Sequence, residues 1–453
     1  MNNRARECIN DSTRELLPNG DFLKKPNFVN IQRFNSVGFS RIFVATAKID
    51  GRNGIKTGDR VYFKANNQRG VNHLNRTDES MGSCEDLGEV FGYYMIRTLN
   101  ERLGEKAVLK PTVYDFAEYK NDAFWKIIAE QTAKKVESDR LYGCITKNCL
   151  EDNAQIVHGH MLLGQIFDRN TCFRSSTNTL FNYEQGIMAF AEKIKSDGQE
   201  MVIDPVCTRY LANVMFWDYF YCNADRHCKN ITFQLIPLGD GKFWFCPTPI
   251  LDNGGGLGLQ SINCEKMYRE QMASINQNGK MVEYVGGIKN AFDVPLDFYI
   301  GKGSFKNEDI AKNYDEMSYE EQLVMLLSQN RTLFNDFKNM YTAFDVDYAF
   351  GRMRSETRYN KDFLAGFDTV AQSVINYKKE KFSKAIANVL GVEFDEELFN
   401  KNPLAYLNML EGIVLEDELN LFIATDEQRF EFEARMKKLQ EQHKQKQNGD
   451  DIC

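Results

Sequence analysis

Two polar motifs near the middle of the chain combine residue types that can transfer a phosphoryl group. The first reads N-A-D-R-H-C-K-N over 223–230, with Asp225 five residues ahead of Asn230, and the second, L-D-N-G, contains Asp252. One carboxylate can hold an incoming hydroxyl, whereas a carboxylate and an amide oxygen can bind magnesium against nucleotide phosphates. The D-x-x-x-x-N spacing is typical of protein-kinase catalytic loops, and D-N-G stands where such kinases have D-F-G. The two motifs therefore predict phosphoryl transfer from ATP with magnesium.

The residues around these motifs predict the elements that would position them. Apolar residues recur at helical spacing between 211 and 219, so a helix is expected just before Asp225. Strand signals at 231–236 and 242–246 flank a Gly-Asp-Gly turn, which predicts a hairpin between the two motifs. Taken separately, each motif could be an ordinary polar turn, since Asp, Asn and Gly favour turns. Their joint spacing across one hairpin favours a shared site.

A kinase also needs a strand lysine that reaches the nucleotide phosphates and a helix glutamate that holds this lysine. The β-prone run V-Y-F-K-A at 61–65 supplies Lys64. An apolar helical stripe follows between 87 and 95, where Glu89 is the preferred partner and Glu85 the second choice. An exposed lysine and a solvated glutamate are the ordinary alternative. Because Lys64 and Glu89 precede the catalytic motif in the order that kinases show, the kinase interpretation is favoured.

The segment 34–41, which reads F-N-S-V-G-F-S-R, is the candidate phosphate-covering loop. It precedes a predicted strand at 42–49, and a turn here could offer backbone N–H groups to phosphates. Gly38 is its one glycine, so the segment has no G-x-G-x-x-G pattern. An ordinary turn into a strand is therefore a close alternative.

The residue order within the first motif excludes an ordinary eukaryotic-type kinase, because Arg226 and His227 follow the Asp and do not precede it. Instead, N-A-D-R-H-C-K-N-I-T-F and P-I-L-D-N-G-G-G-L-G resemble the catalytic and metal motifs of the HipA-like serine/threonine kinases. Upstream, G-C-I-T-K at 143–147 and I-V-H-G at 156–159 resemble a stretch of the stand-alone members of that family. The resemblance extends roughly over 35–259.

The resemblance implies a bilobed fold related to protein kinases and phosphoinositide kinases, with ATP and magnesium as cofactors. It also implies roles for four residues of the two motifs. Asp225 would be the catalytic Asp, Asn230 and Asp252 would bind magnesium, and His227 would be the loop histidine that steadies the site.

Two further family properties bear on this chain. Several members phosphorylate a serine in the phosphate loop, for which Ser36 and Ser40 are the candidates here. The larger HipA-type toxins carry an additional N-terminal subdomain ahead of that loop, where about thirty residues stand in this sequence. The chain therefore resembles the stand-alone members more than the toxins that work with a DNA-binding antitoxin, and an antitoxin partner is disfavoured.

The expected fold class is α+β, a bilobed protein-kinase-like fold with a small strand-rich N-lobe and a large, mainly helical C-lobe. We expect 1–30 as a polar lead-in, 31–138 as the N-lobe, 139–425 as the C-lobe with the catalytic loop and metal site, and 426–453 as a charged C-terminal helix and tail. Helical periodicity is evident at 318–340, 361–390 and 403–415. The nucleotide base is expected near the lobe junction, at 128–132 or at 146–149.

Composition fits a two-lobed enzyme, because 453 residues with 43% hydrophobic side chains can form two or three domains. The net charge of −8 and the lack of a long Lys/Arg run argue against nucleic-acid binding. No window has the apolar length of a membrane span, and the first twenty residues lack the apolar core of a secretory signal. Eleven cysteines without a C-x-x-C pair, with five scattered histidines, predict no zinc site and suit a reducing cytoplasm of bacterial type. Secretion as an effector without a cleavable signal stays open.

Two other function classes remain open. A pseudokinase would bind nucleotide without catalysis, but such proteins usually lose one of the four residues Lys64, Asp225, Asn230 and Asp252, all of which are present here. A phosphoinositide-type lipid kinase would share the related fold, but no basic membrane-binding helix is evident. ATP- and magnesium-dependent phosphorylation of Ser or Thr, on another protein or on this chain, is the leading interpretation. The sequence does not identify the protein substrate.

Overall fold

The structure is a computed structural model that describes residues 15–17, 28–34, 41–47, 55–65, 85–120, 140–151, 153–223, 225–258, 296, 298–304, 313–353 and 361–415. The candidate phosphate-loop residues Ser36, Gly38 and Ser40 lie outside these ranges, as do the base-binding candidate 128–132 and the charged segment 426–453. Among the described residues, no helix combines the length and the apolar character that crossing a membrane requires.

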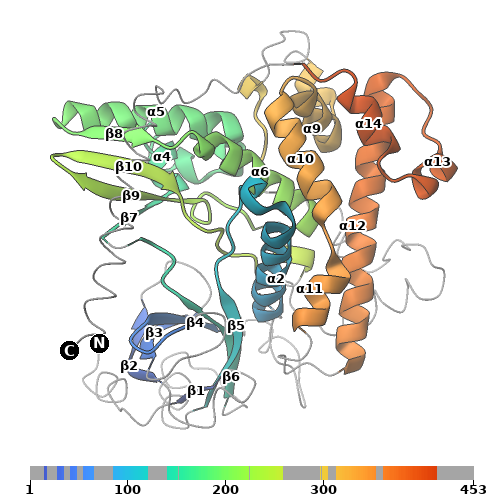
Figure 1. The fold of residues 1–453 in the computed structure, drawn as a ribbon. Helices are drawn as coiled ribbons and strands as arrows, with labels where there is room; N and C mark the ends of the chain where they lie inside the picture. The colour runs from blue at the N-terminus through green and yellow to red at the C-terminus, as the bar shows by residue number, and fades with distance from the viewer. Residues whose placement is uncertain are drawn as a thin grey trace.

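An antiparallel sheet of six strands forms the N-terminal lobe, at the lower left of Figure 1. Its spatial order is β1-β5-β6-β4-β3-β2. Lys64 lies on the central strand β4, where Ile42 and Cys144 are its neighbours on the two adjacent strands. The strands are β1 (Glu15–Leu17), β2 (Phe28–Phe34), β3 (Arg41–Ala47), β4 (Arg60–Ala65), β5 (Tyr114–Lys120) and β6 (Arg140–Lys147).

Side-chain alternation along β4 decides which way Lys64 points. Val61 and Phe63 are buried on one face of the sheet, so Lys64 lies on the other face. Cys144 and Phe116 stand in the same cross-strand row as Lys64, and both belong to the main hydrophobic core. The helix α2 (Glu85–Leu103) packs on this face, against β5 and β6. Lys64 is therefore directed toward the helix that carries Glu89.

Helix α2 is buried along most of its length because it lies between the N-terminal sheet and helices of the C-terminal lobe (Figure 1). Leu87, Val90 and Phe91 contribute to the core, and α10 and α11 pack against the helix from the other side. A helix that is apolar around most of its circumference is one that packs on several sides. Glu89 and the neighbouring Asp86 are thus drawn into the interior by the apolar residues around them.

The C-terminal lobe is mainly helical and shares one continuous core with α2. The long helix α12 has the bounds that the sequence periodicity predicted. The periodic stretch 318–340 forms two helices, because Asn330 caps the second one by accepting a hydrogen bond from the Leu333 N–H. The helices are α4 (Gly159–Leu163), α5 (Leu180–Ser196), α6 (Val206–Tyr221), α9 (Tyr319–Ser328), α10 (Arg331–Ala343), α11 (Val346–Met353), α12 (Lys361–Leu390), α13 (Glu396–Lys401) and α14 (Ala405–Glu411).

A second, four-stranded sheet lies within the C-terminal lobe, in the order β7-β9-β10-β8. Its centre is the predicted hairpin, in which Asp240 and Gly241 take φ values of 52° and 72° in the turn. The flanking strands β7 and β8 are absent from the sequence prediction, which expected helices around the hairpin. The strands are β7 (Gln155–His158), β8 (Glu200–Ile203), β9 (Thr232–Gly239) and β10 (Lys242–Pro247).

The predicted α+β class is confirmed, with an N-terminal antiparallel sheet and a largely helical C-terminal region. Two details of the predicted division differ. The strand β6 (Arg140–Lys147) belongs to the N-terminal sheet, where it pairs with β4 and β5, so that sheet extends past the boundary expected at 138. Within the expected lead-in, β1 pairs with β5 and β2 begins at Phe28.

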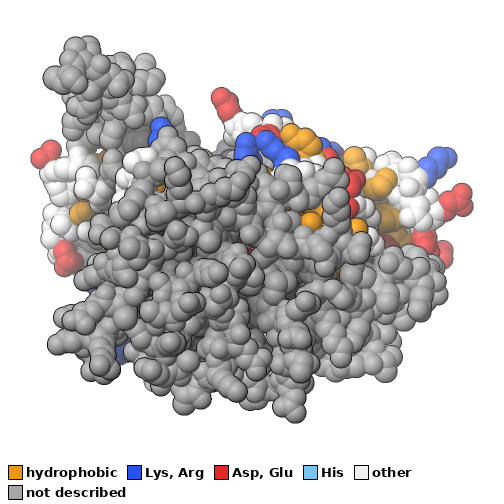
Figure 2. All heavy atoms as spheres, turned by 90° about the horizontal axis from the view of Figure 1, so that it is seen from below, with side chains coloured by type: hydrophobic (Ala, Val, Ile, Leu, Met, Phe, Trp, Pro, Cys, Tyr) orange, Lys and Arg blue, Asp and Glu red, His pale blue; other side chains and the backbone are white. Residues whose placement is uncertain are grey.

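In the view from below, the described side chains that are visible carry charges of both signs, mixed with hydrophobic ones (Figure 2).

Candidate active site

The end of helix α6 directs the first motif back across the lobe. Cys222 takes the left-handed conformation, with φ of 50°, and the Asn223 N–H bonds to the Asp218 carbonyl at 3.0 Å. The loop then closes on itself, because the Asn230 N–H donates to the His227 carbonyl at 2.9 Å. It leads directly into β9, whose position in the sheet anchors its far end. The loop is therefore held at both ends by regular elements.

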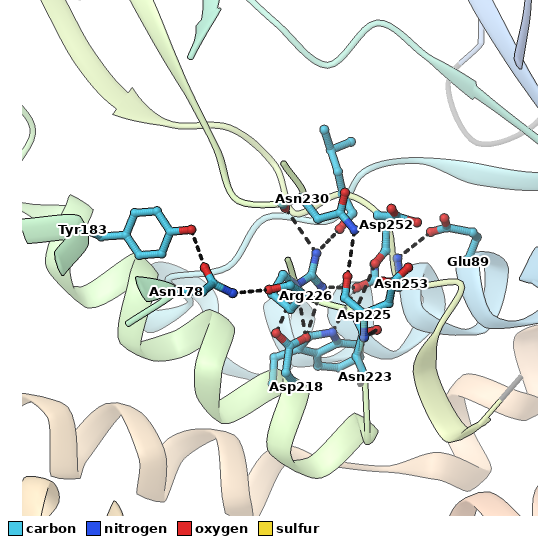
Figure 3. A network of polar contacts seen from close by, with 12 residues as sticks. Glu89, Asn178, Tyr183, Asp218, Asn223, Asp225, Arg226, Asn230, Asp252 and Asn253 are labelled. Carbon is cyan, nitrogen blue, oxygen red and sulfur yellow. Dashed lines mark hydrogen bonds and ion pairs between the residues drawn. The ribbon is translucent and has the colours of Figure 1, made fainter. Parts of the chain in front are cut away.

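Arg226 is the centre of the polar network that joins the two motifs (Figure 3). Its side chain is 0% exposed and its Nε lies 3.0 Å from an Asp218 carboxylate oxygen. The same guanidinium donates to the carbonyl of Asn230 at 3.3 Å, to the carbonyl of Leu251 and to Asn253 Oδ1 at 3.1 Å. One buried cation thus fixes the first motif to the second, which is a use for the five donors of an arginine.

Burial of the Asp218–Arg226 ion pair shifts the pKa values of both residues. Removal from water raises the pKa of Asp218 to about 6, although the Arg226 charge opposes that rise. Desolvation is the largest influence on Arg226 and lowers its pKa, but the attraction and hydrogen bond of Asp218, together with the charges of Tyr210 and Asp252, leave the pKa raised. A buried pair of this kind costs stability when one partner is removed, since the other charge is left in the interior.

The Asp225 and Asn230 side chains lie around the Arg226 guanidinium in Figure 3. Asn230 Nδ2 donates to the Asp225 carbonyl at 2.8 Å, so its amide oxygen Oδ1 is not used in that hydrogen bond and could bind a cation. The backbone of the loop is also held by a hydrogen bond from Asn178, which precedes helix α5. Asn178 donates to the Arg226 carbonyl at 2.8 Å, and its own Oδ1 accepts a hydrogen bond from the Tyr183 hydroxyl.

Lys64 contacts two carboxylates from two different elements. Its Nζ lies 2.7 Å from Glu89 Oε1, within the 4 Å expected from the sequence, and it also pairs with Asp252 Oδ1. The second oxygen of Glu89 accepts the Asn253 N–H at 2.8 Å. Glu89 therefore holds both the lysine and the backbone of the second motif. Glu85, one turn earlier on α2, raises the pKa of Lys64 through its charge.

The electrostatics of this trio favour charged forms for Lys64 and Asp252. Burial opposes the charge on Lys64, but the attraction of Asp252 and Glu89 raises its pKa well above the usual range. Burial likewise opposes ionisation of Asp252, yet Lys64 and Arg226 lower its pKa to about 2. For Glu89 the desolvation is dominant and raises the pKa to about 7, against the attraction of Lys64.

The backbone of the second motif is strained at Asp252, which takes φ of 57°. A left-handed conformation of a residue other than glycine is unfavourable and marks functional sites in many proteins. Asn223 Nδ2 bonds to the Asp252 carbonyl at 3.2 Å and helps to hold this conformation. The Asp252 side chain keeps 26% of its surface exposed.

Two glycines of α2 make room for the second motif. A Cβ at Gly88 would lie 2.9 Å from the Gly254 carbonyl oxygen, and a Cβ at Gly92 would lie 2.9 Å from Asn253 Cβ. On the other side, Trp217 Nε1 donates to Asn253 Oδ1 at 3.0 Å. The motif is thus pressed between α2 and α6 at a separation that side chains at 88 and 92 would not allow.

The predicted site residues are brought together in two groups. Lys64, Glu89 and Asp252 are in direct contact, while Asp225 and Asn230 lie on the adjoining loop. His227 accepts a hydrogen bond from the Lys229 N–H at 3.2 Å through Nδ1, a contact within the loop.

The sequence reasoning missed the residues that connect these groups, chiefly Arg226, Asn253 and Asn178. The available signal was Asp218 in a strongly apolar helix, because a buried acid requires a cationic partner. The spacing G-x-x-x-G in α2 was a second signal, since residues four apart share one helix face.

The donor set fits a magnesium ion that arrives with a nucleotide. Among the described residues, no group of three or more His, Cys, Asp or Glu side chains could hold a metal by itself. Asp252 is ionised and partly exposed, and Asn230 retains its amide oxygen. Magnesium is commonly bound by one or two protein oxygens together with substrate phosphates and water.

Comparison with known proteins gives matches among solved structures only. No protein-family model matches the chain, and no curated protein does. The structure is similar to the crystal structure of the Helicobacter pylori proinflammatory kinase CtkA, at 11% sequence identity and a TM-score of 0.46, over 83% of this chain and 100% of that chain. It is also similar to HipA in the Shewanella oneidensis MR-1 toxin–antitoxin complex of HipA, HipB and operator DNA. That match has 14% identity and a TM-score of 0.39, over 80% of this chain and 68% of that chain.

Proposed function

We propose that this protein is a HipA-like serine/threonine protein kinase that uses ATP and magnesium to phosphorylate another protein or itself. The observation that carries the proposal is the contact of Lys64 with both Glu89 and Asp252, beside the loop of Asp225 and Asn230. A lysine held by a helix glutamate, next to a metal-binding Asp, is the arrangement that phosphoryl transfer from ATP requires. A structural ion-pair network would not need the adjoining D-x-x-x-x-N loop.

Each residue has a distinct part in the proposed reaction. Lys64 binds phosphate oxygens, and Glu89 keeps its ammonium group in position from the buried side. Asp252 and Asn230 would hold the magnesium ion, which neutralises charge on the phosphates when it is bound. Asp225 orients the acceptor hydroxyl and accepts its proton as the new P–O bond forms, while the bond between the terminal phosphorus of ATP and its bridging oxygen breaks and ADP leaves.

The adenine base is assigned to the chain that leaves the N-terminal sheet. Of the two segments expected from the sequence, 146–149 spans the end of β6, and the Asn148 N–H bonds to the Arg60 carbonyl at 3.2 Å. This attachment supports 146–149 as the hinge.

The seven described cysteines are free thiols, which supports the reducing cytoplasm as the location.

The first experiment measures nucleotide binding and phosphate transfer on the same preparation. Millimolar ATP with magnesium should raise the melting temperature, because a ligand that binds only the folded state stabilises it by roughly 2.7 kcal/mol at one hundred times its Kd. Labelled ATP should then transfer its terminal phosphate to Ser or Thr, as located by mass spectrometry. Stabilisation without any transfer would support a pseudokinase. If neither occurred, the proposal would be rejected.

A further inference from the structure

A row of aromatic rings ending in a lysine runs beside the candidate catalytic loop. The ring centroids of His158 and His160 are 5.6 Å apart, and those of His160 and Phe173 are 5.4 Å apart, in stacked orientation. Lys229 Nζ lies 5.1 Å from the centre of the Phe173 ring. The Phe173 side chain is 47% exposed. We call His160, Phe173 and Lys229 the loop-side patch.

The loop-side patch is attached to the loop by backbone hydrogen bonds. The His160 N–H donates to the Cys228 carbonyl at 3.0 Å, and His158 Nδ1 lies 2.9 Å from the Lys229 carbonyl. A His158 Nδ1–H that donates there fixes the orientation of that ring. His160 is therefore joined to the loop that carries Lys229, and Phe173 stacks on His160. A ligand on the patch would lie beside the loop that carries Asp225.

Lys229 supplies the positive charge of the loop-side patch. No carboxylate of the described residues forms an ion pair with Lys229. The Nδ1 atom of His160 is buried and has no hydrogen-bond partner among the described residues. The nearby Asp168 is already engaged, since it accepts the Thr171 hydroxyl at 2.6 Å and two backbone N–H groups.

The distance along the chain places the patch within reach of an acceptor peptide. Lys229 follows Asp225 by four residues, so their Cα atoms are at most about 14 Å apart. An extended peptide covers this distance in about four residues. A side chain on the patch would thus belong to the same short segment as the phosphorylated Ser or Thr.

We propose that the loop-side patch binds an acidic side chain of the protein substrate, within about four residues of the acceptor Ser or Thr. The Lys229 ammonium group pairs with the carboxylate, and the exposed Phe173 ring covers the adjoining peptide. This inference deepens the proposed kinase function and rests on it. Charge complementarity carries it, since the chain as a whole has a net charge of −8 whereas this position beside the loop presents the Lys229 ammonium group, which forms no ion pair with a described carboxylate.

The test measures binding without phosphate transfer. A fluorescein-labelled peptide with Ala at the acceptor position and Glu three residues away is titrated with full-length protein, with ATP analogue and magnesium present. The same peptide with Gln in place of Glu is the matched ligand. The Glu peptide should bind roughly tenfold more tightly, as expected for one charge-assisted contact, and the difference should shrink as salt is added.

Two variants and one control assign the effect to the patch. Lys229→Gln removes the charge but keeps a polar side chain, and it should abolish the preference for Glu over Gln. Phe173→Ala removes an exposed ring and should weaken both peptides. The control is Lys195→Gln, an exposed lysine near the end of α5, which should bind like the wild type. Equal binding of the two peptides, or equal effects of Lys229→Gln and Lys195→Gln, would overturn the inference.

A third peptide with phosphoserine in place of Glu separates the two sources of negative charge. Binding of both the Glu and phosphoserine peptides agrees with the proposal. Binding of the phosphoserine peptide alone contradicts it, because the site would then be specific for phosphate. Since no transfer is measured, a failure here is distinct from a failure of the kinase function, which the ATP assays test.

Discussion

The carboxylate of Glu89 is completely buried and depends on Lys64 for its compensating charge. Its pKa is raised to about 7 by burial even with the lysine in contact. Removing the lysine would leave Glu89 and Asp252 near each other without a cation between them. At the residue scale, the charge of Lys64 thus compensates two carboxylates, those of Glu89 and Asp252. A bound triphosphate would add a further negative group in contact with Lys64.

Lys64→Met tests this balance directly. We expect turnover to fall by roughly two to three orders of magnitude, because an electrostatic contact to the transferred group is lost. The ATP affinity should fall too, since Lys64 would no longer bind phosphate. Lys56→Met, at an exposed position just before the same strand, is the control and should retain full activity. Similar turnover for the two variants would show that Lys64 has no part in the reaction.

A buried acid elsewhere in the C-terminal lobe predicts a pH dependence of stability. Glu184 on α5 is 3% exposed, its Oε1 has no hydrogen-bond partner among the described residues, and burial raises its pKa from 4.5 to about 8. Below pH 4.5 the group is protonated in both the folded and unfolded states. As the pH rises to 8, the unfolded state ionises first, so the free energy of unfolding decreases.

Glu184→Gln removes this titration with little change of shape. The variant should become more stable relative to the wild type as the pH rises from 5 to 8, by up to roughly 1.4 kcal/mol for each unit of pKa shift. The measurement is a denaturant titration of both proteins at several pH values, with extrapolation of the free energy of unfolding to water. A constant difference across this range would be inconsistent with a buried, protonated Glu184.

At the scale of elements, the contact between α2 and the second motif sets the position of Glu89 and Asp252. Gly88 and Gly92 lie four residues apart on the helix face that meets this motif. The Tyr221 hydroxyl also donates to the Gly88 carbonyl at 2.7 Å, which ties α6 to the same turn. Helix α2 is therefore the element through which the strand of Lys64 and the second motif are aligned.

Gly92→Ala should push α2 away from Asn253, because the new methyl group would meet Asn253 Cβ at 2.9 Å. We expect a loss of stability of about 1–3 kcal/mol from overpacking and a fall in turnover. The matched control is Gly351→Ala in α11, where a Cβ meets nothing within 4 Å. That change should stabilise the protein by about 0.5–1 kcal/mol through helix propensity. If Gly92→Ala stabilised the protein as Gly351→Ala does, the close contact between Gly92 and Asn253 would be wrong.

The elements that could be predicted from the sequence are those with a strong local pattern. The periodicity at 361–390 matches α12, and the Gly-Asp-Gly turn matches the β9–β10 hairpin. The strands β7 and β8 have four residues each, too few to show an alternation, and they are strands because they pair with that hairpin. The N-terminal sheet likewise includes β6 through pairing with distant strands, which no local signal reveals.

In the candidate site, too, residues with a local sequence pattern differ from residues that only the fold brings together. The candidate residues Asp225, Asn230 and Asp252 stand in motifs whose spacing is local, so the sequence alone is enough to propose them. Arg226 could not, because its partners Asp218, Leu251 and Asn253 come together only through the fold. In the sequence, Arg226 was merely a departure from the residue order of ordinary eukaryotic-type kinases.

At the scale of the whole molecule, α2 is attached to both lobes. Arg352 Nη1 on α11 lies 2.6 Å from a Glu101 carboxylate oxygen, and Arg102 pairs with Asp345 at the start of α11. These exposed pairs contribute little stability by themselves, but they orient α2 relative to the C-terminal lobe (Figure 1). The N-terminal sheet is joined to the second motif through the same helix.

The central claim is that Asp225 and Asp252 perform different tasks in one phosphoryl transfer, and a paired measurement of ATP binding and single-turnover rate tests it most directly. Asp225→Asn keeps the shape of the side chain but removes the carboxylate, so the rate should fall by roughly two to four orders of magnitude while ATP affinity changes little. Asp252→Ala removes a magnesium ligand, so nucleotide affinity, magnesium dependence and rate should all suffer. The account would be contradicted if Asp225→Asn abolished nucleotide binding while Asp252→Ala left magnesium affinity unchanged.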